Sequence, residues 1–99
     1  MIYWYDKQGN QISPERGSRL AENFSYKKVK STNLPGGKWV STVWLGMDHA
    51  FGSGAPLIFE TMVFPSESDF TDLDCRRYST EEEAVTGHDE MVDKWSAKA

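Results

Sequence analysis

The residues best suited to chemistry lie in the segment 47–55, a glycine-containing stretch between two β-rich segments. It holds Asp48, His49 and Phe51 close together, and its glycines permit backbone conformations closed to other residues, a combination typical of ligand-binding loops. A histidine beside a carboxylate can transfer protons or hold a metal near neutral pH. A structural interpretation is also open, in which Asp48 caps a strand end, His49 is solvated and Phe51 packs on the core.

Two further ionisable residues, Glu60 and His88, are candidates for the same site. Glu60 is predicted to lie in a strand among large apolar side chains such as Trp44 and Met62, where burial would raise the pKa of its carboxyl group. Alternatively, Glu60 lies at a sheet edge and pairs with a lysine or an arginine. His88 falls on the apolar stripe of the last predicted helix, where a histidine is either a hydrogen-bonded core residue or a ligand facing the strands.

Convergence of the four polar candidates would suffice for a divalent metal or for acid–base catalysis, but their spacing matches no metal-binding motif. Cys75 is the only cysteine, so the chain cannot form an intramolecular disulfide or a cysteine-rich zinc site. No nucleophile motif is present. We therefore expect no catalytic residue, no metal site and no cofactor. The candidate ligand- or partner-binding residues are Trp44, Asp48, His49, Phe51, Glu60, Met62 and His88.

A long-loop antiparallel hairpin of residues 38–46 and 56–64 must position these side chains, because both segments are rich in β-branched and aromatic residues. If residue 46 pairs near residue 56, one mostly apolar face should meet the helices, and it contains the opposed pairs Leu45–Leu57, Val43–Phe59, Ser41–Thr61 and Trp39–Val63. The other face then contains the pairs Val40–Met62, Thr42–Glu60 and Trp44–Ile58. A slip of one residue would change every pair, since side chains alternate between the two faces.

The rest of the chain supplies further elements. They are a short strand near residues 2–5, a helix over 14–23 after an N-cap serine, a strand over 25–32, an acidic loop over 65–74, a short strand over 75–78 and an amphipathic helix that begins after a capping box at Thr80 and Glu83. The order β-α-β-β-β-(β)-α predicts an α+β fold, with an antiparallel sheet of four to five strands and helices packed on one face.

Length and charge limit the classes of function. The 99 residues suit a single domain, 1–99, and the net charge of −4 argues against generic nucleic-acid binding. The charge is polarised: residues 1–46 carry seven Lys or Arg against three Asp or Glu, whereas residues 47–99 carry four against twelve. The N-terminal residues lack a basic segment followed by an apolar run. We therefore expect a cytoplasmic protein without membrane contact.

Several segments resemble a group of small uncharacterised proteins of bacteriophages and bacteria. The resemblance covers most of the chain and is carried by residues 39–49, residues 56–64, residues 77–84 with the pair Gly87-His88, and more loosely residues 3–6. It implies a phage or mobile-element setting, and a host-cell cytoplasmic location if the gene is phage-borne. It implies no particular activity, so no functional residue is transferred.

From the missing catalytic motif, the excess of aromatic residues and the implied phage setting, we predict a non-enzymatic binding protein. It would interfere with a host defence process by binding a host protein or by sequestering a small nucleotide-type ligand, for which aromatic residues and lysines could supply stacking and phosphate contacts. One alternative is a small metal-dependent or acid–base hydrolase that uses Asp48, His49, Glu60 and His88. A second alternative is a homo-oligomeric structural protein that assembles through the edge of the hairpin.

Overall fold

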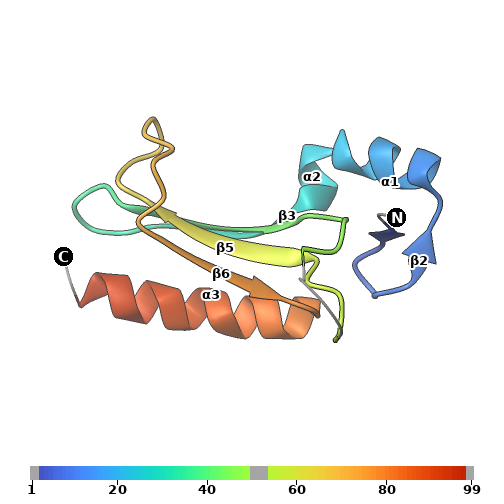
Figure 1. The fold of residues 1–99 in the computed structure, drawn as a ribbon. Coiled ribbons are helices and arrows are strands. Elements are labelled where there is room, and N and C mark those ends of the chain that lie inside the picture. The colour runs from blue at the N-terminus through green and yellow to red at the C-terminus, as the bar shows by residue number, and fades with distance from the viewer. Residues whose placement is uncertain (1–2, 50–53, 98–99) are drawn as a thin grey trace.

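The computed structural model describes residues 3–49 and 54–97. In chain order its elements are β1 (Trp4–Tyr5), β2 (Gln11–Ile12), α1 (Pro14–Ala21), α2 (Phe24–Lys27), β3 (Lys28–Asn33), β4 (Trp39–Trp44), β5 (Phe59–Phe64), β6 (Asp74–Tyr78) and α3 (Glu81–Ser96). The strands form a four-stranded antiparallel sheet of order β3-β4-β5-β6 and a separate two-stranded sheet (Figure 1). The predicted α+β fold is confirmed. None of the helices in these two ranges is long and apolar enough to cross a membrane.

Helix α3 covers one face of the four-stranded sheet (Figure 1). It begins as predicted, because Thr80 and Glu83 form a reciprocal capping box: each side chain accepts a hydrogen bond from the other residue's backbone N–H at 3.1 Å. Positions three and four apart share one helix face, and this spacing buries Ala84, Gly87 and His88 against the strands. The helix therefore fixes which face of the sheet is buried.

The segment before the sheet departs from the prediction. Helix α1 begins after its N-cap Ser13, as expected. The predicted strand over 25–32 begins later, at Lys28, because the side chain of Asn23 accepts a bond from the backbone N–H of Tyr26 at 3.2 Å. That cap closes a second helical turn, α2, and delays the strand.

The hairpin of β4 and β5 is present, but its register differs from the predicted one by one residue. The opposed pairs are Trp39–Phe64, Val40–Val63, Ser41–Met62, Thr42–Thr61, Val43–Glu60 and Trp44–Phe59. The prediction placed Gly46 opposite Pro56; instead the carbonyl of Gly46 accepts a bond from the backbone N–H of Tyr5 at 2.8 Å, and Pro56 has no N–H to offer. The odd-numbered residues of β4, expected to meet the helices, therefore lie on the opposite face, and this part of the prediction was wrong.

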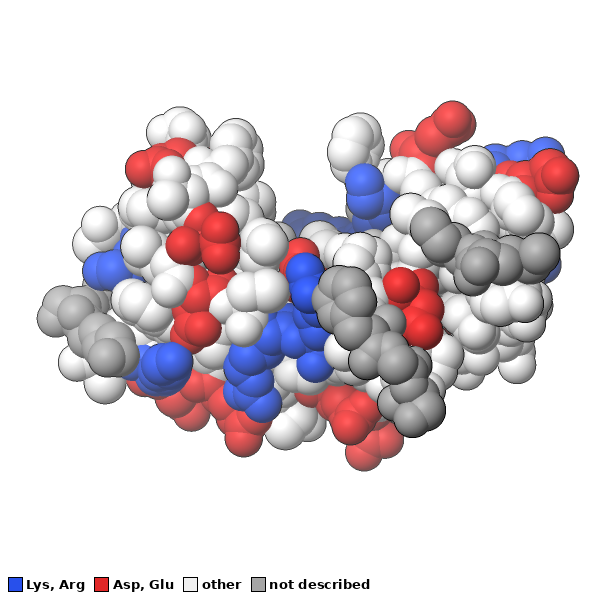
Figure 2. All heavy atoms as spheres, viewed as in Figure 1, with Lys and Arg blue, Asp and Glu red and all other residues white. Residues whose placement is uncertain are grey.

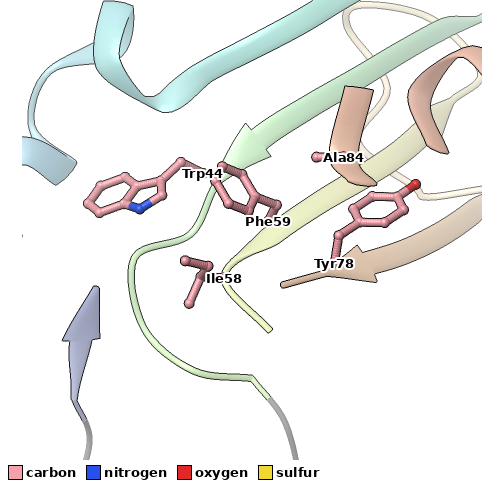
Figure 3. Packing of buried hydrophobic residues seen from close by; sticks show 5 residues of the cluster. All are labelled: Trp44, Ile58, Phe59, Tyr78 and Ala84. Carbon is pink, nitrogen blue, oxygen red and sulfur yellow. The ribbon is translucent and has the colours of Figure 1, made fainter. Parts of the chain in front are cut away.

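One buried cluster extends from Trp44, at the end of β4, to Ala84 of α3 (Figure 3). The indole N–H of Trp44 donates to the carbonyl of Tyr5 at 3.0 Å, and the ring of Tyr26 packs edge-on against the indole at 5.0 Å between centroids. Figure 3 shows how Trp44 extends from β4 beside Phe59, while the other members of the cluster lie around them: Ile58, Tyr78 and Ala84. These contacts tie the N-terminal segment to the end of the sheet.

The opposite face of the four-stranded sheet, which we call the open face, has no helix over its middle within the described residues (Figure 1). Helix α2 rises above one end of this face, and the segment 65–73 between β5 and β6 rises above the other end. The molecular surface is hollowed between these two raised parts (Figure 2).

Candidate binding groove on the open face

The floor of the hollow contains a groove of about 210 Å³, lined by Trp39, Ser41, Val43, Glu60, Met62, Phe64 and Phe70. Strand pairing brings six of these residues together, since the odd-numbered residues of β4 lie opposite the even-numbered residues of β5. Phe70 joins them from the segment 65–73. We refer to these seven residues as the groove.

Three aromatic rings form one wall of the groove. The ring centroids of Trp39 and Phe64 are 5.4 Å apart, and Phe70 packs edge-on against Phe64 at 5.8 Å. The indole N–H of Trp39 donates to the Ser31 hydroxyl at 2.7 Å, which fixes the orientation of that ring. Phe70 remains 71% exposed, whereas Phe64 is 9% exposed, so Phe70 presents most of the apolar surface of the wall to water.

Glu60 supplies the only charged side chain of the groove lining. It is 8% exposed, and its Oε2 accepts bonds from Nε of Arg77 at 2.9 Å and from the thiol of Cys75 at 3.5 Å. Both donors use the same oxygen, so Oε1 has no protein donor among the described residues. Burial, and then the neighbouring Glu60 carboxylate, raise the pKa of the Cys75 thiol to about 11, which keeps it protonated as a donor. Glu60 therefore forms an ion pair, as one predicted interpretation has it, and also lines the groove.

His88 lies on the other side of the sheet, under α3. It is fully buried, with Nε2 2.8 Å from the Thr32 hydroxyl and Nδ1 2.7 Å from the Thr42 hydroxyl, and Thr42 is bonded in turn to Thr61 at 2.5 Å. Burial lowers the pKa of the imidazole, so the neutral form predominates near neutral pH. Each threonine hydroxyl can donate or accept, so either neutral tautomer satisfies both bonds. His88 is thus a hydrogen-bonded core residue in this structure.

The other sequence-predicted candidates are also spread apart. Trp44 is buried in the core, in contact with Tyr5 and Tyr26. The Asp48 carboxylate accepts a bond from the backbone N–H of Leu57 at 2.9 Å, and Nδ1 of His49 donates to the carbonyl of Met47 at 2.8 Å. Phe51 lies outside the described residues. Of the six candidates that the structure describes, it brings only Glu60 and Met62 into the groove. Within 3–49 and 54–97 no three His, Cys, Asp or Glu side chains are grouped to hold a metal ion.

Sequence reasoning missed most of the groove. Trp39 and Val43 were assigned to the face that meets the helices, and the observed register would have placed them beside Glu60 and Met62. Phe70 had one available signal: it is a lone aromatic residue in an acidic segment rich in serine, where an apolar side chain has no core partner nearby in sequence. Its contact with Phe64 depends on the path of the loop.

A larger hollow of about 690 Å³ lies between β6 and the first half of α3. Its charged lining is predominantly acidic, with Glu82, Glu83 and Glu90 against a single arginine, Arg76. Arg76 is bonded to Glu90 at 3.1 Å, and both side chains are exposed. This shallow surface is typical of a solvated sheet and helix edge, so the smaller apolar groove is the better candidate site.

Comparisons with protein-family models, with curated proteins and with solved structures found no match to this chain. No family is assigned on that basis. The residues of the groove and their contacts are therefore the basis for the functional proposal.

Proposed function

We propose that this protein is a non-enzymatic binding protein that captures a segment of a host protein in the groove. The observation that carries the proposal is the apolar groove on the open face, at whose wall Phe70 lies mostly in water. Covering such surface with a partner releases it from water, which is the main favourable term in protein association. In the phage setting implied by the sequence resemblance, the captured protein would belong to a host defence process.

The size and charge of the groove favour a protein segment over a nucleotide. Pockets for small-molecule ligands are usually about 300–1,000 Å³. The groove measures about 210 Å³, which is room for one or two side chains. Its carboxylate, Glu60, would repel a phosphate placed over the floor. We therefore favour the host-protein partner over the nucleotide-type ligand.

The hydrolase alternative has no geometric support. It requires Glu60 and His88 to act on one substrate, whereas the sheet separates them: Glu60 lines the open face and His88 is bonded to threonines under α3. Asp48 and His49 make local bonds in the segment between β4 and β5 and do not line the groove. We do not carry this alternative further.

A comparative pulldown tests the proposal. Immobilised wild-type protein, Met62→Lys and the matched control Val85→Lys are incubated with lysates of bacterial hosts, and retained proteins are identified by mass spectrometry. Met62 is in the groove, whereas Val85 is 37% exposed on α3. We expect one host protein that wild type and Val85→Lys retain and that Met62→Lys loses, with all three variants equally folded by circular dichroism. Absence of any protein with that pattern, or a nucleotide released from the purified wild type, would overturn the proposal.

A further inference from the structure

The chain carries an exposed apolar side chain, Phe24, that complements its own groove. We call this side chain the knob. Phe24, on α2, is 82% exposed, and Nζ of Lys27 lies 5.3 Å from its ring centroid. Transfer of this apolar ring from water to a partner surface would be favourable. Helix α2, which carries Phe24, lies on the side of the sheet opposite α3 (Figure 1).

We propose that a second copy of this chain inserts Phe24 and Lys27 into the groove, and that two-fold symmetry makes the contact reciprocal. The raised α2 of one copy would enter the hollow of the other, which lies between the raised parts in Figure 2. A two-fold axis parallel to the sheet brings each α2 over the partner's groove, so a single kind of contact occurs twice and the assembly closes as a dimer.

The chemistry of the two surfaces matches. The three aromatic rings of the groove offer edge and face contacts to Phe24. The Lys27 ammonium group would meet a carboxylate, since Glu60 keeps one oxygen without a protein donor in the described structure. The ion pair between Glu60 and Arg77 uses Oε2, so it leaves Oε1 for this contact.

Charge over the raised parts is complementary as well. Residues 13–28, which contain α1 and α2, carry four Lys or Arg against two Asp or Glu. The segment 65–73 carries three acidic residues and no basic residue. A two-fold arrangement places the basic raised part of each copy toward the acidic raised part of the other, which favours association and orients it.

This self-association goes beyond the proposed function, because it occupies the same groove that would capture a host protein. A host segment and a second copy would then compete, and capture would release monomers. The contact also differs from the predicted assembly through the hairpin edge, since it uses the face of the sheet and leaves the edge strands β3 and β6 unpaired.

Sedimentation velocity over a range from about 1 µM to about 1 mM tests the dimer. We expect wild type to pass from monomer to dimer, and Phe24→Ser to raise the dissociation constant at least tenfold, as is common for a central aromatic anchor. The fold should tolerate this substitution because the side chain is almost fully exposed. Val85→Ser, a matched apolar change on the exposed side of α3, should leave the dissociation constant unchanged. A monomeric wild type, assembly beyond the dimer, or equal effects of the two substitutions would overturn the inference.

A mixing experiment tests the reciprocal contact. Phe24→Ser lacks the knob and Met62→Lys blocks the groove, so neither should dimerise alone. Mixed together they retain one intact contact, in which Phe24 of the Met62→Lys chain enters the groove of the Phe24→Ser chain. We expect a heterodimer weaker than the wild-type dimer, and its absence would contradict the inference. The proposed function is tested separately, because Phe24→Ser should still capture the host protein that Met62→Lys loses.

Discussion

Replacing Gly87 by alanine has two opposing effects on the stability of α3. In an exposed helix interior this change stabilises by about 1 kcal/mol, because alanine has the higher helix propensity. Here, an added Cβ would lie 2.2 Å from Cε1 and 2.3 Å from the phenol oxygen of Tyr78. Carbon atoms in contact are about 3.5–4.0 Å apart, so α3 or Tyr78 must move by more than about 1 Å.

The surroundings of Tyr78 decide which effect wins. Its ring is packed in the core cluster with Phe59 and Ala84, so it cannot move into the core, although Tyr78 also lines the larger hollow between β6 and α3. Overpacking of a core costs about 1–3 kcal/mol, and a displacement of this size belongs at the upper end of that range. After subtracting the propensity gain, we expect Gly87→Ala to lower the free energy of unfolding by roughly 2 kcal/mol, which corresponds to a fall in Tm of roughly 8–16 °C.

Urea denaturation followed by circular dichroism measures the effect. Thr86→Ala, at an exposed position of the same helix, is the control and should change the free energy of unfolding by only a few tenths of a kcal/mol. In a Tyr78→Leu background the ring is absent, and Gly87→Ala should become neutral or stabilising. The reasoning is refuted if Gly87→Ala stabilises the wild type, or if its cost is the same in the Tyr78→Leu background.

Three further outcomes follow from caps and buried groups. Thr80→Ala removes the capping box of α3 and should cost about 1 kcal/mol in urea denaturation, whereas an unchanged midpoint would show that the cap contributes nothing. The pKa of His88 is lowered from its ordinary value of 6.5 by burial and by Lys30, against the opposing effect of Asp89, so the unfolded chain binds the proton more readily. Stability should therefore be full above pH 6.5 and fall as the pH drops below it, and a flat profile between pH 6.5 and 5 would contradict this. With its pKa near 11, the Cys75 thiol should react with a thiol reagent at pH 8 far more slowly in the folded protein than in urea, and equal rates would refute the assignment.

Local signals in the sequence predicted those elements that depend on neighbouring residues. The capping box at Thr80, the N-cap at Ser13 and the β-rich segments of the hairpin each depend on side chains a few positions apart, and each element is present. The turn α2 was missed because a single asparagine cap outweighed the β propensity of the residues after it. The fold class follows from such local patterns.

The site was harder to predict because it depends on contacts between distant residues. The register of β4 and β5 is set partly by the bond from Tyr5 to Gly46, forty-one positions away, which no local pattern reveals. The predicted register is one residue away from the observed one, so it places the side chains of β4 on the wrong faces. With that register, Trp39 and Val43 do not share a face with Glu60. His88 and Glu60 were correctly singled out as unusual, yet only the three-dimensional arrangement shows that the sheet lies between them.

The threonine and histidine side chains between α3 and the sheet determine the position at which the helix packs. Contacts between apolar side chains are non-directional, so they tolerate a small shift of a helix along a sheet. The chain of bonds from Thr32 through His88 and Thr42 to Thr61 is satisfied only when α3 lies at one height along the strands. A shift by one turn would leave the His88 imidazole and the Thr32 hydroxyl without these partners, at about 1–3 kcal/mol for each buried group. Thr42 and Thr61, on the paired strands β4 and β5, would keep the bond between them. The hydrogen-bond network therefore stabilises one position of α3 along the strands over neighbouring positions with similar apolar contacts.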